Sequence, residues 1–466
     1  MSHAAVTSEY RTAAPTWRFG RKLGDWALGL IVFLGGFVMR EPAPYELMLV
    51  PLILVWAFFG LKLNRAFMPM LLLLALYLVG GILALTQLPS ISTGVLYAAT
   101  SAFLVLSAIF FAAVIAEAPE RRLTIIKQAY IAAAVFTSLL GIGDYFHVIP
   151  GGGLFLRYGR VMGAFQDPNV FGPFLVLPIA LLFRDILTER LRNSPVDAAL
   201  LLVLLLAEFL AFSRAAWAMT LVALVIVGLL AYFNEPRQLG RLRIVLYFAA
   251  GLGAVALLLA VALSIPAIYE LFVQRAQLLE SYDAGHLGRF ARQAIGFFLV
   301  QEHPLGLGPE AFGKLLGEDE HNMWLKGFTT YGWIGGFSYI VLVVWTLVVS
   351  FPLLFKRRSW TPIVQCAFAV YVGQVMIHNV IDNDHWRHLF LLSACFGAQS
   401  PRKGCMCAVF TGRRSSGDAR PPRCPVPYRS TCSASNGPVF PPTRCAAFPR
   451  IDGSRSSRQC LAARGA

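Results

Sequence analysis

Residues 66–86 read AFMPMLLLLALYLVGGILALT, and none of them carries a charge. A helix of about 20 apolar residues is long enough to cross the hydrocarbon core of a bilayer, which is about 30 Å thick. Stretches of this kind recur along the chain, and we expect spans at residues 25–39, 44–60, 66–86, 93–116, 124–146, 169–183, 196–212, 215–233, 244–265, 323–355, 361–380 and 386–399. The sequence therefore predicts an all-α polytopic membrane protein with about 12 transmembrane helices.

The composition agrees with this prediction. Hydrophobic residues make up 57% of the 466 residues and charged residues 14%, whereas soluble domains contain roughly 25% charged residues. A soluble fold of this length could not hide so much apolar surface. We therefore exclude an ordinary soluble domain, and we expect no nucleic-acid partner.

The positions of lysine and arginine predict the orientation of the spans. Loops that stay in the cytoplasm carry an excess of these residues, and alternate loops of this chain are basic, for example 121–127 and 356–358. The loops between them, including 147–168, 266–322 and 380–388, are expected on the outer face. An even number of spans then places both termini in the cytoplasm. The largest outer loop, residues 266–322, lies between the ninth and tenth predicted spans.

Three regions are expected: a cytoplasmic amino terminus over residues 1–24, a membrane domain over 25–399 and a tail over 400–466. Residues 401–466 hold twelve Lys and Arg against two acidic residues, and six of the eight cysteines of the chain. This composition, without a hydrophobic period, is typical of disorder. A zinc site is the alternative for the cysteines, but the tail has neither a Cys-x2-Cys pair nor a histidine. We hypothesise that the tail is a frameshift product of GC-rich DNA, and we assign it no function.

Two polar clusters lie on the expected outer face around the sixth to eighth spans. Residues 160–169 read RVMGAFQDPN, so Asp167, Pro168 and Asn169 open a span. Such residues cap helices well, and a capping role and a functional role both remain open. The second cluster is Ser213-Arg214 in a short turn, although an arginine anchor is more usual on the cytoplasmic side.

Two further clusters lie in the 266–322 loop. Arg289, Arg292 and Gln293 fall on one face of a predicted amphipathic helix, which as a plain structural element would lie among lipid headgroups. His321-Asn322 opens the tenth span, where a histidine more often caps or packs than catalyses. The last outer loop adds Asp382, Asp384 and His385.

In this order, the clusters resemble the O-antigen ligase and O-antigen (exopolysaccharide) polymerase superfamily of polytopic membrane glycosyltransferases. The resemblance covers residues 160–336. It consists of Gly-x-Phe-x-Asp-Pro-Asn, Ser-Arg in an outer turn, Gly-Arg before an amphipathic helix ending in Pro-Leu-Gly-x-Gly, and His-Asn before Gly-x-Ile-Gly. The segment 378–388 is similar to the last outer loop of the polymerase branch, which slightly favours a polymerase over a ligase. The resemblance implies transfer of a saccharide from an undecaprenyl-diphosphate carrier to an acceptor, at the outer face of the bacterial inner membrane.

The resemblance also assigns roles to individual residues. Arg214 and Arg289 match the family's arginines, and guanidinium groups bind phosphate oxygens in bidentate fashion. His321 matches the family's histidine and would accept the proton of the acceptor hydroxyl. Contacts to sugar or diphosphate are expected from Arg160, Asp167, Asn169, Arg292, Asn322, Asp382, Asp384 and His385.

The resemblance implies no metal and no other cofactor, because two arginines can neutralise the diphosphate. The expected partners are the undecaprenyl-diphosphate-linked saccharide, a saccharide or lipid A-core acceptor, and membrane lipid. A chain-length regulator is a further candidate partner.

A polytopic secondary transporter, or a flippase for lipid-linked saccharides, is the alternative. Transporters often contain internal repeats with interrupted helices near the middle of the bilayer. This chain shows no convincing repeat, and its unusual polar residues gather at the outer ends of the spans. Saccharide transfer without an ion gradient would favour the enzyme.

Overall fold

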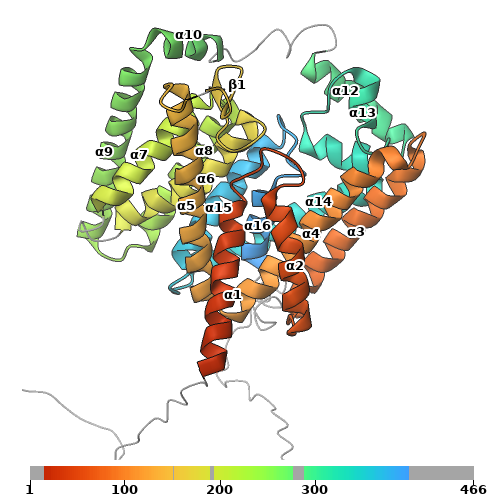
Figure 1. Cartoon of the computed structure of the whole chain (residues 1–466), viewed down its shortest axis with the longest axis horizontal. Coiled ribbons are helices and arrows are strands. Elements are labelled where there is room, and N and C mark those ends of the chain that lie inside the picture. Colours follow the sequence, from red (N-terminus) through yellow and green to blue (C-terminus); the bar gives the residue numbers. More distant parts are fainter. Residues whose placement is uncertain (1–14, 64, 151, 189–193, 276–287, 398–466) are drawn as a thin grey trace, which may run out of the picture. The chain divides into compact units, whose positions relative to one another are not determined.

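The computed structural model describes residues 15–63, 65–150, 152–188, 194–275 and 288–397, which are mostly helical (Figure 1). The predicted tail and residues 1–14 of the predicted amino-terminal region lie outside them. The α-helices are α1 (Pro15–Leu34), α2 (Pro44–Phe58), α3 (Met68–Ala84), α4 (Ser92–Glu117), α5 (Pro119–Tyr145), α6 (Pro168–Thr188), α7 (Ser194–Leu210), α8 (Arg214–Asn234), α9 (Gln238–Leu263), α10 (Pro266–Arg275), α12 (Arg289–Glu302), α13 (Ala311–Leu316), α14 (Met323–Ser350), α15 (Thr361–Ile377) and α16 (Arg387–Gly397).

Short elements connect several of these helices. Single 3-10 turns precede and follow α3, at η1 (Arg65–Phe67) and η2 (Leu85–Gln87), and another follows α14 at η3 (Phe351–Phe355). Strands β1 (Leu156–Arg157) and β2 (Arg160–Val161) pair antiparallel in the loop before α6.

Seven helical segments of the described chain are long and apolar enough to cross a membrane: Arg65–Gln87, Ser92–Glu117, Pro119–Tyr145, Pro168–Thr188, Arg214–Asn234, Gln238–Leu263 and Met323–Phe355. Each of the twelve predicted spans falls on a helix, but α2 and α15 have only 15 and 17 residues. At about 1.5 Å per residue, helices of that length fall short of about 30 Å of hydrocarbon. The protein is a helical, multi-pass membrane protein, and the count of twelve spans stays a prediction.

Helix α6 is the most enclosed of the seven segments, with 78% of its apolar window buried. It packs against α7, α8 and α15. Gly172 allows the close approach of α8, because a Cβ on Gly172 would lie 2.7 Å from the Cβ of Ala216 and 3.6 Å from that of Ser213. The beginnings of α6 and α8 are therefore held side by side.

Helices α3 and α14 make another close contact. A Cβ on Gly80 would lie 2.6 Å from the backbone nitrogen of Gly335, and the rings of Tyr77 and Tyr331 stack with centroids 4.0 Å apart. Gly332 interrupts α14 with φ 65° and ψ −173°. Only glycine adopts such a backbone readily, so this residue divides α14 into two parts, residues 323–331 and 333–350.

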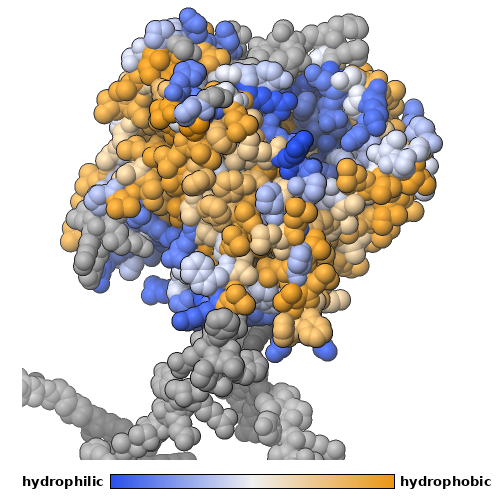
Figure 2. All heavy atoms as spheres, viewed as in Figure 1, coloured by the Kyte–Doolittle hydropathy of each residue, from blue (hydrophilic) through white to orange (hydrophobic). Residues whose placement is uncertain are grey.

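Residues on both sides of Gly332 hold α12 and the loop that follows it. The Trp333 indole donates to the carbonyl of Val300 in α12 at 2.7 Å, and the Leu307 amide donates to the carbonyl of Thr329 at 2.6 Å. On the face shown in Figure 2, hydrophobic residues cover a broad band, and a hydrophilic hollow lies near α12 and α13.

The predicted amphipathic helix is present as α12. Its polar face is turned inward, because Arg292 is buried and the Gln293 amide donates to the carbonyl of Glu320 at 3.2 Å. Phe297 and Phe298 on its other face are 61% and 67% exposed. This orientation brings the polar side chains of α12 towards the beginning of α14.

Candidate active site

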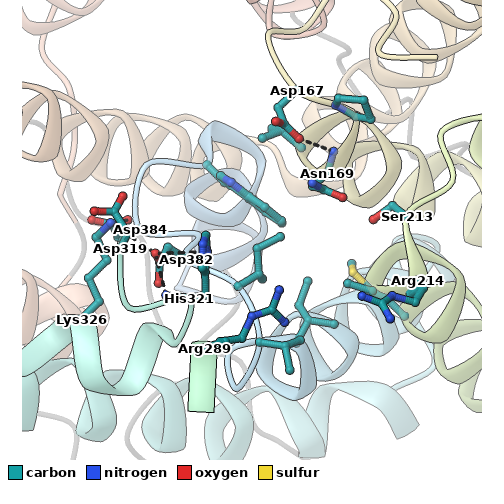
Figure 3. Close-up of a pocket in the computed structure, with 18 of the residues that line it drawn as sticks. Asp167, Asn169, Ser213, Arg214, Arg289, Asp319, His321, Lys326, Asp382 and Asp384 are labelled. Carbon is teal, nitrogen blue, oxygen red and sulfur yellow. Dashed lines mark hydrogen bonds and ion pairs between the residues drawn. The ribbon is translucent and has the colours of Figure 1, made fainter. Parts of the chain in front are cut away.

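The polar ends of several helices surround a cavity of about 1020 Å³. It is lined from the beginnings of α6, α8, α12 and α14 and from the loop between α15 and α16 (Figure 3). Nine of the eleven predicted site residues line it: Arg160, Asp167, Asn169, Arg214, Arg289, His321, Asp382, Asp384 and His385. The structure brings these residues together from five segments of the sequence, and their roles stay predictions.

The other two predicted residues do not line the cavity. Arg292 is buried and forms an ion pair with Glu318. Asn322 caps α14, where its side-chain oxygen accepts the amide of Leu325 at 3.1 Å. Glu318, the partner of Arg292, and His321, the residue before Asn322, do line the cavity. Arg292 and Asn322 therefore hold lining residues in place and do not face the cavity themselves.

Arginine gathers at one end of the cavity. Arg214 and Arg289 are the first residues of α8 and α12, and Figure 3 shows their side chains directed into the same space. Arg160 is buried beside them and donates to the carbonyl of Ala211 and to Asn169 Oδ1, both at 2.8 Å. This end of the cavity suits an anionic group.

Apolar side chains line the same cavity between its charged groups. They come from α8, α12 and the end of α15, and they include Ala218, Met219, Phe290, Met376, Ile377 and Val380. A ligand with both an anionic head and an apolar chain fits such a lining better than a purely polar one.

His321 stands just before α14, on the side of the cavity that Lys326, Asp382 and Asp384 line (Figure 3). Its φ of 47° lies in the left-handed region, which a non-glycine residue adopts only where its surroundings hold it. Asp382 stabilises this backbone conformation, because its carboxylate accepts hydrogen bonds from the amides of His321 at 3.2 Å and of Asn322 at 2.9 Å. The His321 Nδ1 atom lies 4.0 Å from Asp382 Oδ2, and the side chain is 39% exposed. The imidazole is thus oriented and open to the cavity.

A buried lysine connects the two aspartates of the last loop. Lys326 Nζ lies 3.6 Å from Asp382 Oδ2 and 3.9 Å from Asp384 Oδ1. Asp384 also accepts hydrogen bonds from the hydroxyl of Tyr97 and, at 3.1 Å, from that of Tyr331. Asp382 and Asp384 are therefore anchored to α4 and α14.

These contacts shift the pKa values of the loop carboxyls in opposite directions. Burial, with the nearby charge of Asp384, raises the pKa of Asp382 despite Lys326. Burial also acts to raise the pKa of Asp384, but Lys326, His385 and the two tyrosine hydroxyls outweigh it and lower that pKa. Asp384 is accordingly the more firmly ionised member of the pair.

Two neighbouring groups favour their neutral forms. Burial raises the pKa of Glu320 to about 7, with a further contribution from Asp382 and an opposing one from Lys326. Burial lowers the pKa of His385, whose Nε2 atom lies 2.9 Å from the hydroxyl of Ser101. The acidic end of the cavity thus combines ionised and neutral groups within one network.

Lys326, Asp319 and Tyr97 line the cavity but were not among the predicted site residues. Lys326 could have been found, because it is the only charged residue in the sequence of α14, and a charge within a span is commonly functional. Asp319 and Tyr97 carry no comparable signal. Among the described residues, no group of three His, Cys, Asp or Glu side chains is arranged to hold a metal ion.

No protein-family model matches this chain, and no curated protein is significantly similar to it in sequence. The resemblance to the O-antigen ligase and polymerase superfamily therefore rests on the motifs and their order.

Proposed function

We propose that the protein transfers a saccharide from an undecaprenyl-diphosphate-linked donor to an acceptor, in polymerisation or ligation of an exopolysaccharide or O-antigen. The observation that carries this proposal is that Arg214, Arg289 and His321, which lie on three separate segments, line one cavity. Two arginines and a histidine in one cavity match the two needs of the reaction: an anion site for the leaving group and a base for the nucleophile.

In the proposed reaction, a hydroxyl oxygen of the acceptor attacks the anomeric carbon of the donor. The new bond joins that oxygen to the carbon, and the bond from the carbon to the diphosphate oxygen breaks. His321 accepts the hydroxyl proton, and the lipid diphosphate leaves with the electron pair. Attack opposite the leaving group inverts the anomeric configuration.

Charge on the diphosphate grows as its bond to the sugar breaks. Arg214 and Arg289 supply hydrogen bonds from charged donors, each of which contributes about 1.5–3 kcal/mol. Because these bonds strengthen as the charge develops, part of that energy lowers the barrier. The Nδ1 atom of His321 lies 4.0 Å from Asp382 Oδ2, so the Asp382 carboxylate stabilises the positive charge that His321 acquires when it accepts the proton.

We place this reaction at the outer face of the bacterial inner membrane, in a protein of twelve spans with both termini in the cytoplasm. The distribution of lysine and arginine supports this orientation, because the basic loops alternate with the loops that carry the site. Five more helices would add to the seven longer spans to give twelve: α1, α2, α7, α15 and α16.

The decisive experiment uses the purified protein in liposomes with an undecaprenyl-diphosphate-linked saccharide and an uncoupler that abolishes ion gradients. We expect a longer lipid-linked saccharide or a glycosylated acceptor, together with free undecaprenyl diphosphate. Movement of the intact donor across the bilayer without bond cleavage would instead support the transporter or flippase.

A deletion strain separates the two forms of the proposed reaction. Loss of a polymerase leaves single repeat units on the lipid carrier, whereas loss of a ligase leaves finished polymer on it. A strain that makes normal polysaccharide and accumulates neither intermediate would contradict the proposal.

A further inference from the structure

Ser213 has an unusual position next to the arginine end of the cavity. The residue is 2% exposed, and its hydroxyl oxygen has no hydrogen-bond partner among the described residues. Ser213 lines the cavity, and Figure 3 shows its side chain near Arg214 at the edge of the open space. A buried hydroxyl normally finds a partner, so a group within the cavity is the natural candidate.

The ordinary role of a serine at this position would be to cap the following helix. Ser213 is the N-cap residue of α8 and has the extended backbone typical of caps, with φ −105° and ψ 104°. Its side chain nevertheless accepts no hydrogen bond from α8. The hydroxyl is therefore available as a donor to a ligand.

The beginning of α12 has the same construction. Its N-cap residue is Gly288, which has no side chain to cap the helix, and its first residue is Arg289. The first N–H groups of a helix have no acceptor within it and attract anions. Arg289 and Phe290 of α12, and Arg214 and Ala215 of α8, line the same cavity.

We propose that Ser213 is a binding residue for a diphosphate ester, and that the beginnings of α8 and α12 each receive one of its two phosphoryl groups. This inference rests on the proposed function and adds the groups that complete its anion site. Ser213 donates its hydroxyl to the phosphoryl group at α8, beside the guanidinium of Arg214. Two helix ends and two arginines match a diphosphate better than a single phosphate.

Three variants separate binding from capping. Ser213→Thr keeps the hydroxyl, and Ser213→Ala removes it. Ser213→Asp caps a helix as well as serine does, but its carboxylate repels an anion. If Ser213 only capped α8, Ser213→Asp would be harmless and Ser213→Ala would lower the melting temperature. Ser264→Ala is the matched control, because Ser264 lies at the end of α9, away from the cavity.

The probe is farnesyl diphosphate, and farnesol and farnesyl monophosphate are the comparison ligands. Each ligand is titrated into the full-length protein in detergent, and calorimetry measures its binding. We expect Ser213→Thr and Ser264→Ala to bind the diphosphate within about threefold of the wild-type protein. Loss of one hydrogen bond to a charged group predicts about tenfold or greater weakening in Ser213→Ala. We expect Ser213→Asp to show no measurable binding at an unchanged melting temperature.

Each outcome is informative. If the wild-type protein binds farnesyl diphosphate and both Ser213→Ala and Ser213→Asp bind it equally well, the role of Ser213 is refuted and the proposed function stands. If the monophosphate binds as tightly as the diphosphate, the assignment of one phosphoryl group to each helix is wrong. If the wild-type protein binds farnesol as tightly as the diphosphate, the diphosphate donor is refuted, and this inference fails with it. If Ser213→Asp does not fold, Ser213→Ala against Ser213→Thr still decides the role of the hydroxyl.

Discussion

The Asp382 Oδ1 atom lies 2.9 Å from the backbone nitrogen of Asn322. Through this bond the loop between α15 and α16 fixes the beginning of α14, the point at which His321 enters the cavity. A second bond runs between the same segments, because the amide of Met323 donates to the carbonyl of His378 at 2.7 Å. The histidine is thus positioned from a loop that follows it by about two spans in the sequence.

Lys326→Met should destabilise the protein strongly. The ammonium lies 3.6 Å from Asp382 and 3.9 Å from Asp384, and removing one partner of a buried ion pair costs about 3–5 kcal/mol. The melting temperature in detergent measures the loss. Lys314→Met is the control, because Lys314 is an exposed residue paired with Glu310 on the surface. Equal melting temperatures for the two variants would contradict the prediction, and Asp384→Asn added to Lys326→Met should recover part of the stability.

Glu320→Gln should raise stability at pH 8 but not at pH 4. Burial raises the pKa of Glu320 from 4.5 to about 7, so the folded protein holds this proton more firmly than the unfolded chain does. The contribution of Glu320 is most favourable below pH 4.5 and declines as the pH rises to about 7, by about 3 kcal/mol in total. Melting temperatures of both proteins across this range test the sign. Identical pH profiles would show that Glu320 does not titrate in this way.

His321→Asn should abolish most of the activity without unfolding the protein. Asparagine tolerates the left-handed backbone of this position, while it cannot act as a base. We expect polymer formation in a complemented deletion strain to fall by about 10²–10⁴-fold, at an unchanged amount of protein in the membrane. His303→Asn is the matched control, because His303 does not line the cavity. A normal polymer ladder in the His321 variant would rule out the proposed base.

Gly80→Ala should weaken the contact between α3 and α14. The new methyl group would lie 2.6 Å from the Gly335 nitrogen, and overpacking of this kind typically costs about 1–3 kcal/mol. Gly253→Ala in α9 provides the comparison, because no atom lies within 4 Å of the position of its Cβ. Thermal unfolding should show a loss only for the first variant. Since Tyr331 also holds Asp384, activity should fall with Gly80→Ala.

The sequence was sufficient to predict helices at the twelve apolar stretches, because about 20 successive apolar residues have few alternatives to a membrane helix. Arg214, Arg289 and His321 were predicted from the order of the motifs. The structure brings them to one cavity, while their roles stay predictions. The short helices α2 and α15 show where prediction from the sequence fails. Hydropathy alone does not determine where a helix stops, and both are too short to cross about 30 Å of hydrocarbon unaided.

The network behind His321 could not be derived in the same way. Lys326 meets Asp382 and Asp384 only when α14 packs beside the last loop, and no local pattern relates residues so distant in the chain. The ion pair of Arg292 could not be derived from the sequence either, because its partner Glu318 lies beyond the end of α12. Three-dimensional packing decides which charges face the cavity and which face each other.

The break at Gly332 has a mechanical consequence. The part of α14 before Gly332 carries Lys326 and follows directly on His321. In a regular helix the amide of Trp333 would donate to the carbonyl of Thr329, but at the break the Trp333 amide donates to the carbonyl of Pro304 at 2.8 Å, and the Thr329 carbonyl accepts the amide of Leu307 at 2.6 Å. The donor and the acceptor that the break releases from α14 thus both bind the loop after α12, and this loop is fastened to the membrane helix within a few residues of the cavity.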